Sequence, residues 1–463
     1  MSAIPPSITI AEAGRLIAAK KLSPVELTKT MLARIKAVDP KINAFLAVTE
    51  KQALAAARAA ERAVMAGQKH PLLGIPVAYK DIYETAGIPT TAHSRILQTN
   101  VPRQDAETVR RLREAGTIML GKLATHEFAI GGPAFDLPWP PARNPWDTRR
   151  FTGGSSSGSA AAVAAGLALG ALGSDTGGSI RLPAAFCGIA GLKPTPGLVS
   201  RRGVIPLAPS LDTAGPMAWT AEDCALLLDT LAGHDPADPA SVAGPAVVYA
   251  NALAAPVKGL RVGLLRHVYE HDMPAAPEVL QAMNRAVAVL KSLGCRVEDA
   301  TLPPLQDFNA VGRIIISAEA YALHEANLQT RLSDYSRTFR IRVLSGALIR
   351  ASEYIAAQRR RTDLIAATAQ AFARFDLLIS TPTTGSAPML SEQRPDDGFG
   401  RPLLTTLANV AAVPSLVVCA GFTTAGMPLG LEIIGPAWGD ATVLRLGHQF
   451  ERESGTRDRR PEI

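Results

Sequence analysis

The sequence predicts an α/β layered fold built around one large central sheet. The chain has 463 residues, of which 47% are apolar and 19% charged, so it can bury a large core. Short apolar runs recur along it, and helical patterns lie between many of them, which is the alternation typical of α/β layers. The runs expected to form strands are residues 75–79, 117–120, 168–172, 261–265, 377–380, 415–419 and 429–434.

Helices are expected to dominate two parts of the chain. The N-terminal segment, about residues 1–66, contains two capping boxes that begin at Thr9 and Ser23, and Pro24 occupies the first helical position of the second. The segment of about residues 275–375 is also mostly helical in pattern and is interpreted as an insertion that covers part of the core. The whole chain, 1–463, is interpreted as a single domain.

The charge pattern and the cysteines argue against several classes of protein. The formal net charge is +7, but the basic residues come as scattered doublets, so no nucleic-acid partner is expected. The four cysteines are far apart and form no C-x-x-C pair, which argues against zinc and fits a reducing, cytoplasmic compartment. The longest apolar run, residues 160–173, is too short and too rich in glycine to span a bilayer, and the N-terminus lacks a secretory signal, so no membrane association is expected.

Three familiar motifs are incomplete. The run 116–122 matches G-x-x-x-x-G-K, but Leu123 follows where a P-loop needs Ser or Thr to bind magnesium. Residues 126–127 begin H-E-x-x-H, but Ile130 stands at the final position. Residues 154–158 fit the G-x-S-x-G elbow of α/β-hydrolases, yet they follow a turn instead of a strand, and no histidine is suitably placed as the base. The sequence therefore predicts neither a metal nor a cofactor.

A loop at residues 173–181, Gly-Ser-Asp-Thr-Gly-Gly-Ser-Ile-Arg, carries the strongest chemical signal. It follows a predicted strand, and its paired glycines let the backbone turn so that several N–H groups point one way, which suits an oxyanion. Ser179 ends this nest, where a nucleophile is needed. A tight structural turn with a capping serine is the alternative interpretation.

A nucleophilic serine needs a base, and a buried lysine can supply one because burial lowers its pKa. Lys80 ends a predicted strand and is the preferred candidate, although the neighbouring Asp81 could form a simple ion pair with it. Lys122 and Lys193 are rivals that the residues alone do not eliminate.

These segments together resemble the amidase signature family. The resemblance extends over roughly residues 70 to 435 and implies a large central mixed β-sheet flanked by helices on both faces. The motifs that carry it occur in family order: GIPVAYKD at 74–81, NPWD at 144–147, GGSSSG at 153–158, GSDTGGSIR at 173–181, RLPAAFC at 181–187, GLKPT at 191–195, SLDTAGP at 210–216, TPT at 381–383 and PLGLEIIG at 428–435.

The resemblance implies a Ser–cis-Ser–Lys catalytic triad. Ser179 would be the nucleophile, Ser155 the cis-serine that relays protons, and Lys80 the base. Ser179 would attack an amide carbonyl while its proton passes through Ser155 to neutral Lys80, and water would then cleave the acyl-enzyme. The oxyanion hole would consist of the backbone N–H groups of Thr176, Gly177, Gly178 and Ser179.

The resemblance also implies a substrate cleft, for which Phe128, Ala129, Ile130 and Arg181 are the candidates. Helix packing would account nearly as well for the first three residues. Arg181 lies in a family-wide motif, so support of the loop accounts for it better than contact with a substrate carboxylate.

An amidase, a hydrolase of the C–N bond of linear amides, is the activity that the resemblance implies, with a small-molecule amide substrate and no cofactor. A homodimer is a possible assembly. We prefer a free-standing amidase to the A subunit of a glutamine-dependent tRNA amidotransferase, because residues 195–197 lack the Tyr-Gly-Arg pattern expected of such subunits and His126 replaces their usual acidic residue. A family member that acts on a urea, carbamate or ester also stays open.

Overall fold

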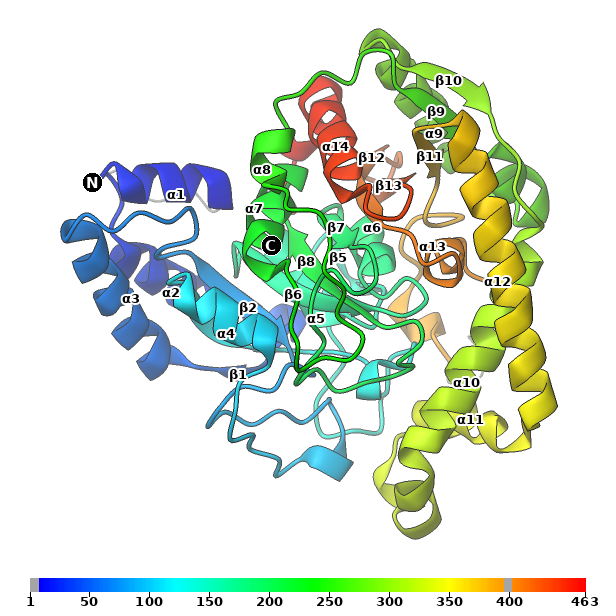
Figure 1. Ribbon diagram of the computed structural model, residues 1–463. Helices are drawn as coiled ribbons and strands as arrows, with labels where there is room; N and C mark the ends of the chain where they lie inside the picture. Colours follow the sequence, from blue (N-terminus) through cyan, green and yellow to red (C-terminus); the bar gives the residue numbers. More distant parts are fainter. Residues whose placement is uncertain (1–7, 395–401) are drawn as a thin grey trace.

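One sheet of eleven strands runs through the computed structural model, which describes residues 8–394 and 402–463 (Figure 1). Its order is β1-β3-β2-β6-β8-β7-β12-β13-β11-β9-β10, and its neighbours pair in both parallel and antiparallel fashion, so the sheet is mixed. The strands are β1 (Phe45–Val48), β2 (Pro76–Lys80), β3 (Ile118–Leu123), β6 (Gly170–Asp175), β7 (Ala190–Lys193), β8 (Thr213–Ala218), β9 (Arg261–Leu264), β10 (Arg296–Asp299), β11 (Leu377–Ser380), β12 (Ser415–Phe422) and β13 (Pro428–Ile434), with a separate pair β4 (Arg143–Asn144) and β5 (Asp147–Phe151).

Helices flank the sheet on both faces, which confirms the predicted fold class (Figure 1). One group, α7, α9 and α14, packs on strands that include β8, β12 and β13, whereas α5 and α6 contact each other and strands that include β6 and β13. The helices are α1 (Ile10–Ala18), α2 (Pro24–Ile42), α3 (Glu50–Met65), α4 (Glu107–Glu114), α5 (Ser157–Ala164), α6 (Arg181–Cys187), α7 (Ala221–Leu231), α8 (Tyr249–Ala252), α9 (Pro277–Ser292), α10 (Leu305–Thr330), α11 (Arg337–Val343), α12 (Ala351–Arg374), α13 (Thr406–Val410) and α14 (Asp440–Ser454).

The first two helices begin at the predicted caps. The Thr9 hydroxyl accepts a hydrogen bond from the N–H of Glu12, and the Ser23 hydroxyl accepts bonds from the N–H groups of Val25 and Glu26. Each cap satisfies N–H groups that the first turn of a helix leaves without a partner. The segment predicted as mostly helical, about 275–375, contains α9 to α12 but also strand β10, which pairs with β9 at the sheet edge. The interpretation of the chain as one domain with this insertion stays a prediction.

The sheet brings three distant segments to one edge. Strands β2 and β6 are adjacent and parallel, with Val77 opposite Gly170 and Tyr79 opposite Leu172, so their carboxyl ends lie together. Lys80 ends β2, and the loop that leads to α6 follows β6. Helix α5 begins two residues after Ser155 and packs against β6, which brings the glycine–serine run to the same edge.

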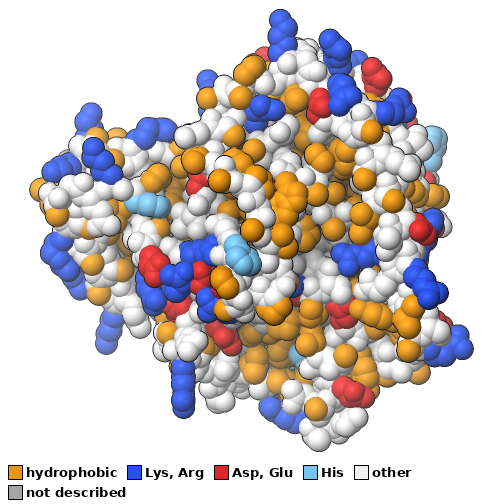
Figure 2. Space-filling model, in the orientation of Figure 1, with side chains coloured by type: hydrophobic (Ala, Val, Ile, Leu, Met, Phe, Trp, Pro, Cys, Tyr) orange, Lys and Arg blue, Asp and Glu red, His pale blue; other side chains and the backbone are white. Residues whose placement is uncertain are grey.

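The surface gives two further observations. Within the described ranges, none of the helices has the length and the apolar character that a membrane span requires. On the face seen in Figure 2, Lys and Arg side chains are spread around the outline with Asp and Glu among them, so this face carries no continuous basic patch.

Candidate active site

Lys80 lies fully buried among three serine hydroxyls. Its Nζ is 2.7 Å from the Oγ of Ser155, 2.8 Å from that of Ser174 and 3.1 Å from that of Ser156. Burial lowers the pKa of Lys80 to about 7, although the negative charges of Asp175 and Asp212 act in the opposite direction. The amine can therefore be neutral near neutral pH and can accept a proton from a hydroxyl.

The two rival lysines do not reach a serine. Lys122 donates hydrogen bonds to the Tyr83 carbonyl and the Thr90 hydroxyl, and its Nζ lies 3.3 Å from Asp81. Lys193 is equally buried, and burial also lowers its pKa to about 7, but its only hydrogen bond to a described residue goes to the carbonyl of Pro194. Geometry therefore distinguishes Lys80 from both, which the sequence could not do.

Ser155 follows a cis peptide bond and connects the lysine to the nucleophile loop. The Gly154–Ser155 bond is cis, and the Ser155 side chain is fully buried. The Ser155 carbonyl accepts a hydrogen bond from the N–H of His126, and the N–H of Ser156 donates to the carbonyl of Ser179. The glycine–serine run is thus fixed on both sides, with the Ser155 hydroxyl directed at Lys80.

The loop after β6 wraps around the carboxylate of Asp175. This carboxylate accepts hydrogen bonds from the N–H groups of Gly178 (2.9 Å) and Ile180 (3.1 Å). Burial raises the pKa of Asp175, but the charge and hydrogen bonds of Arg181 outweigh burial and bring it to about 2, so the carboxylate is ionised. Ser179 is partly exposed at the end of this loop and lines a cleft.

Three of the four predicted oxyanion donors have no other partner among the described residues. Because the Gly178 N–H donates to Asp175, it is not available to an oxyanion, and that part of the prediction is corrected. The N–H groups of Thr176, Gly177 and Ser179 make no hydrogen bond with another described residue. They are the donors that a developing oxyanion could use.

The two triad serines do not bond to each other in the described structure. The Lys80–Ser155 hydrogen bond is formed, but none connects the Oγ atoms of Ser155 and Ser179. Hydrogen bonds between catalytic groups are often long before substrate binds and tighten in the reactive complex. The second link of the predicted relay is therefore open in this state.

Arg181 and Phe128 are absent from the described lining of the cleft, which agrees with the supporting role preferred for Arg181 and with the packing role left open for Phe128. Arg181 is fully buried below the loop, where it pairs with Asp175 at 2.8 Å and with Glu432 at 2.6 Å, so it supports the loop and is not positioned to meet substrate. Phe128 packs into an aromatic cluster with His324, at 4.3 Å between ring centroids, and with neighbouring rings. Ala129 and Ile130 line the cleft, and their contact with substrate stays a prediction.

The cleft has a volume of about 290 Å³. Arginine side chains come from three segments of the chain, and the described lining contains neither Asp nor Glu. Its described walls are formed by His126, Ala129, Ile130, Gly131, Gly132, Pro133, Phe151, Gly154, Thr176, Gly177, Gly178, Ser179, Leu182, Leu207, Asn309, Gly312, Arg313, Ile316, Ser317, Arg342, Gln393, Arg394, Leu403 and Thr406.

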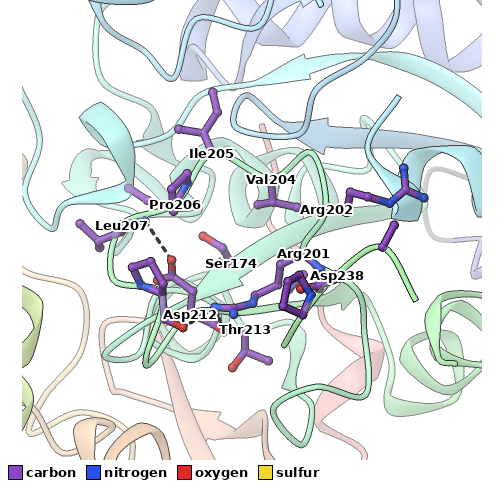
Figure 3. A pocket seen from close by; sticks show the side chains of 15 residues that line it. Ser174, Arg201, Arg202, Val204, Ile205, Pro206, Leu207, Asp212, Thr213 and Asp238 are labelled. Carbon is purple, nitrogen blue, oxygen red and sulfur yellow. Dashed lines mark hydrogen bonds between the residues drawn. The ribbon is translucent and has the colours of Figure 1, made fainter. Parts of the chain in front are cut away.

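A second cavity, of about 200 Å³, is lined mainly by residues of the segment 201–214 (Figure 3). Ser174 lines it, and the same hydroxyl accepts the hydrogen bond from Lys80. Asp212 lies beside it, where it accepts a hydrogen bond from the Thr176 hydroxyl at 2.6 Å. Ala129 and Leu207 line both cavities and so form part of the wall between them.

The sequence missed Ser174, Asp212 and His126 as members of the site. Ser174 lies in the loop of residues 173–181, Asp212 is the acidic residue of SLDTAGP, and His126 begins the incomplete H-E-x-x-H pattern. The positions of Ser174 and Asp212 follow from strand pairing, because the ladder of β6 and β8 places Ser174 opposite Ala214 and next to the segment of Asp212. Knowledge of that pairing could have revealed these two, whereas His126 reaches the site through its contacts with Phe151 and Gly154.

These features define a serine-type hydrolase in which a buried lysine replaces the usual histidine. The family model described as Amidase matches residues 26–444. The A subunit of the glutamyl-tRNA(Gln) amidotransferase of Geobacter metallireducens (strain ATCC 53774 / DSM 7210 / GS-15) is 41% identical over 96% of this chain and 97% of its own. The chain belongs to the amidase signature family, whose enzymes hydrolyse amide C–N bonds.

Solved structures agree with this assignment. A chain from a study of a vestigial protein complex and the evolutionary origins of an s-triazine catabolic enzyme is 34% identical, with a TM-score of 0.91, and the match covers 98% of this chain and 100% of the other. Native peptide amidase from Stenotrophomonas maltophilia is 32% identical, with a TM-score of 0.84 over 98% of each chain.

These findings confirm that the chain is an amidase-class enzyme. They support the second predicted function, the A subunit of an amidotransferase, better than the preferred free-standing amidase, because the curated relative that matches over nearly its whole length carries that name.

Proposed function

We propose that this chain hydrolyses a carboxamide through an acyl-enzyme on Ser179, with Ser155 and Lys80 as the proton relay. The observation that carries the proposal is the environment of Lys80, a fully buried amine that is 2.7 Å from the Ser155 hydroxyl and has a pKa lowered to about 7. A lysine that is about half neutral at pH 7 can act as a general base, and the cis-serine extends its reach to the nucleophile.

The reaction follows from these positions. Ser179 Oγ attacks the amide carbonyl as its proton moves to Ser155, whose own proton moves to Lys80. The N–H groups of Gly177 and Ser179 stabilise the oxyanion, with that of Thr176 beside them. Lys80 then returns the proton through Ser155 to the leaving nitrogen, the C–N bond breaks, and ammonia or an amine departs. Water attacks the acyl-enzyme by the same relay and releases the carboxylate.

One arginine points to a substrate that carries an anionic group. Arg313 lies in α10 and lines the cleft together with Ser179. A guanidinium binds a carboxylate more strongly than a neutral group because the hydrogen bonds are charge-assisted. We therefore infer that the substrate is a small-molecule amide whose acyl part bears a carboxylate, with Arg313 as the residue that would bind it.

Glutamine in an amidotransferase reaction is the specific candidate that the relatives support. It is a carboxamide with a free carboxylate, and the matching relative is named as the A subunit of a glutamyl-tRNA(Gln) amidotransferase. The name of that relative refers to a tRNA. The expectation that this chain has no nucleic-acid partner therefore has no support from the relative, and we do not propose it. The second candidate is a free-standing amidase, which the likeness to peptide amidase supports.

The remaining assignments are also proposals. We infer a cytoplasmic location, which the four cysteines support because each is free and buried. We propose that the chain forms one domain, which the continuous sheet supports. For the free-standing amidase we propose a homodimer, and for the amidotransferase a complex with a different protein.

The test is hydrolysis of a panel of acyl compounds, measured as ammonia for the primary amides and the urea and as the amine or alcohol released from the others, with Ser179→Ala as the blank. The panel contains glutamine, glutaramate (the monoamide of glutarate), pentanamide, a nitroanilide, a urea, a carbamate and an ester. We expect glutamine and glutaramate to be hydrolysed faster than pentanamide. Hydrolysis of glutamine only when a partner protein is added would assign the amidotransferase, whereas fast hydrolysis by the chain alone would assign the free amidase. Equal rates for the wild type and Ser179→Ala on every compound would refute the proposal.

A further inference from the structure

His126 occupies a fixed position in the wall of the cleft, next to the cis peptide. Its ring stacks on Phe151, with 5.7 Å between centroids and 11° between planes. It also lies against the backbone of Gly154, where an added Cβ would be 2.1 Å from the His126 Cε1. The ring therefore has little freedom to rotate, and it faces the cleft beside the reactive serine loop.

The hydrogen bonds of the ring determine which nitrogen carries the proton. The N–H of Gly132 donates to His126 Nδ1 at 2.8 Å, so Nδ1 is an acceptor and carries no hydrogen. Burial lowers the pKa of His126 well below its usual range, and the positive charges of Lys80, Arg342 and His93 lower it further. The imidazole is neutral, with its hydrogen on Nε2.

The Nε2–H group has no partner in the protein part that the structure describes. It makes no hydrogen bond with a described residue. It is also not sealed from solvent, in contrast to His448 Nδ1, which is buried without a partner. The ring lines the cleft, so this donor opens onto the space that substrate would occupy. A neutral N–H donor in the cleft wall suits an oxygen acceptor on the substrate.

We propose that His126 is a substrate-binding residue that donates a hydrogen bond from Nε2–H to an oxygen on the acyl part of the substrate. The ligand class is an amide with a carboxylate or a second amide oxygen beyond the scissile bond, and the proposal rests on the proposed amidase function. The bond from Gly132 orients this donor, because it fixes the ring by its Nδ1 side and leaves Nε2–H directed away from Gly132.

Two substitutions separate binding from support of the loop. In His126→Asn the side-chain oxygen can take the place of Nδ1 and keep the bond from Gly132, but the Nε2 donor is lost. In His126→Gln the side-chain amide reaches the Nε2 position and restores a donor, while the bond from Gly132 is lost. A purely structural role would favour the Asn variant, whereas a substrate-binding role would favour the Gln variant.

The assay compares kcat/KM for glutaramate and pentanamide, which differ only in a terminal carboxylate. We expect the loss in His126→Asn to be about tenfold larger on glutaramate than on pentanamide, chiefly through KM, because only glutaramate offers a carboxylate to the missing donor. His126→Gln is expected to recover most of that loss. Equal losses on both compounds, or an Asn variant as active as wild type on glutaramate, would overturn the proposal.

Nitrogen NMR of histidine-labelled protein tests the same claim without turnover. We expect the His126 signals, assigned by their loss in His126→Asn, to show the neutral Nε2–H form throughout pH 5.5–8, and the Nε2 shift to change when glutaramate is added to Ser179→Ala. A ring that titrates in this range, or that has its hydrogen on Nδ1, would overturn the proposal. If the wild type hydrolysed no amide, the proposed function would fail, and the NMR result would still decide the role of His126.

Discussion

The ionisation of Lys80 should set the acidic side of the pH–activity profile. With a pKa of about 7, the neutral fraction of Lys80 rises from about one-eleventh at pH 6 to about ten-elevenths at pH 8, so kcat/KM should rise about tenfold over this range and then level off. A lysine with an ordinary pKa of 10.5 would instead give a rate that still increases about tenfold per unit at pH 8. Activity is thus present above the lowered pKa and is lost as the pH falls through it.

The perturbation is Lys80→Met, and Lys193→Met is its matched control. Both lysines are fully buried and have pKa values of about 7, but only Lys80 reaches the triad serines. Loss of a general base costs about 100-fold to 10,000-fold in rate. We expect that loss in Lys80→Met, together with loss of the acidic limb, whereas Lys193→Met should keep a limb near pH 7.

The measurement is kcat/KM for the best amide of the panel from pH 5.5 to 9, with circular dichroism to verify folding of each variant. A Lys80→Met enzyme that retains the acidic limb would refute the reasoning. So would a wild-type profile that is flat between pH 6 and 8, or a limb that disappears in Lys193→Met alone.

Three further predictions concern the groups around the triad. Asp212→Asn removes a negative charge that raises the pKa of Lys80, so the midpoint of the acidic limb should move to lower pH, and an unchanged or higher midpoint would contradict this role. Gly178→Ala places a Cβ 2.0 Å from Thr405 Oγ1 at a φ of +131°, so kcat/KM should fall about 100-fold or more as the loop shifts; Gly177→Ala, whose Cβ would meet only Ile316 Cδ1 at 3.7 Å, should keep far more activity. Asp175→Asn leaves Arg181 with only Glu432 as a buried anion, so the free energy of unfolding should fall by about 3 kcal/mol or more in denaturant titrations, and a stable variant would contradict the role assigned to the pair.

The strands with a strong apolar signal could be predicted from the sequence, and those without it could not. Residues 377–380 and 415–419, which are rich in Leu, Val and Ile, form β11 and the start of β12 as expected. Strand β8, Thr-Ala-Gly-Pro-Met-Ala, contains Gly and Pro and gave no signal, although it lies buried in the middle of the sheet. Its stability comes from long-range pairing with β6 and β7, which local propensity does not report.

Site residues that stand in a motif could be predicted from the sequence. The partners of site residues could not, because contacts between distant segments determine them. Lys80, Ser155 and Ser179 each stand in a quoted motif, and the structure brings them to one edge of the sheet, where their catalytic roles stay a prediction. The buried pairing of Arg181 with Glu432 joins residues 251 positions apart, so no local pattern could assign it. The same holds for the donation of the Gly178 N–H to Asp175, because a sequence that permits a nest does not reveal which N–H group is already used.

The central claim is that Ser179, and not a serine of the GGSSSG run, carries the acyl group. Covalent labelling with phenylmethylsulfonyl fluoride or a fluorophosphonate, followed by peptide mapping, tests it most directly, because these reagents modify the activated serine itself. We expect one adduct per chain, on Ser179. Labelling should slow as the pH falls below 7 and should be lost in Lys80→Met. An adduct on Ser155 or Ser156, or full activity after complete modification of Ser179, would contradict it.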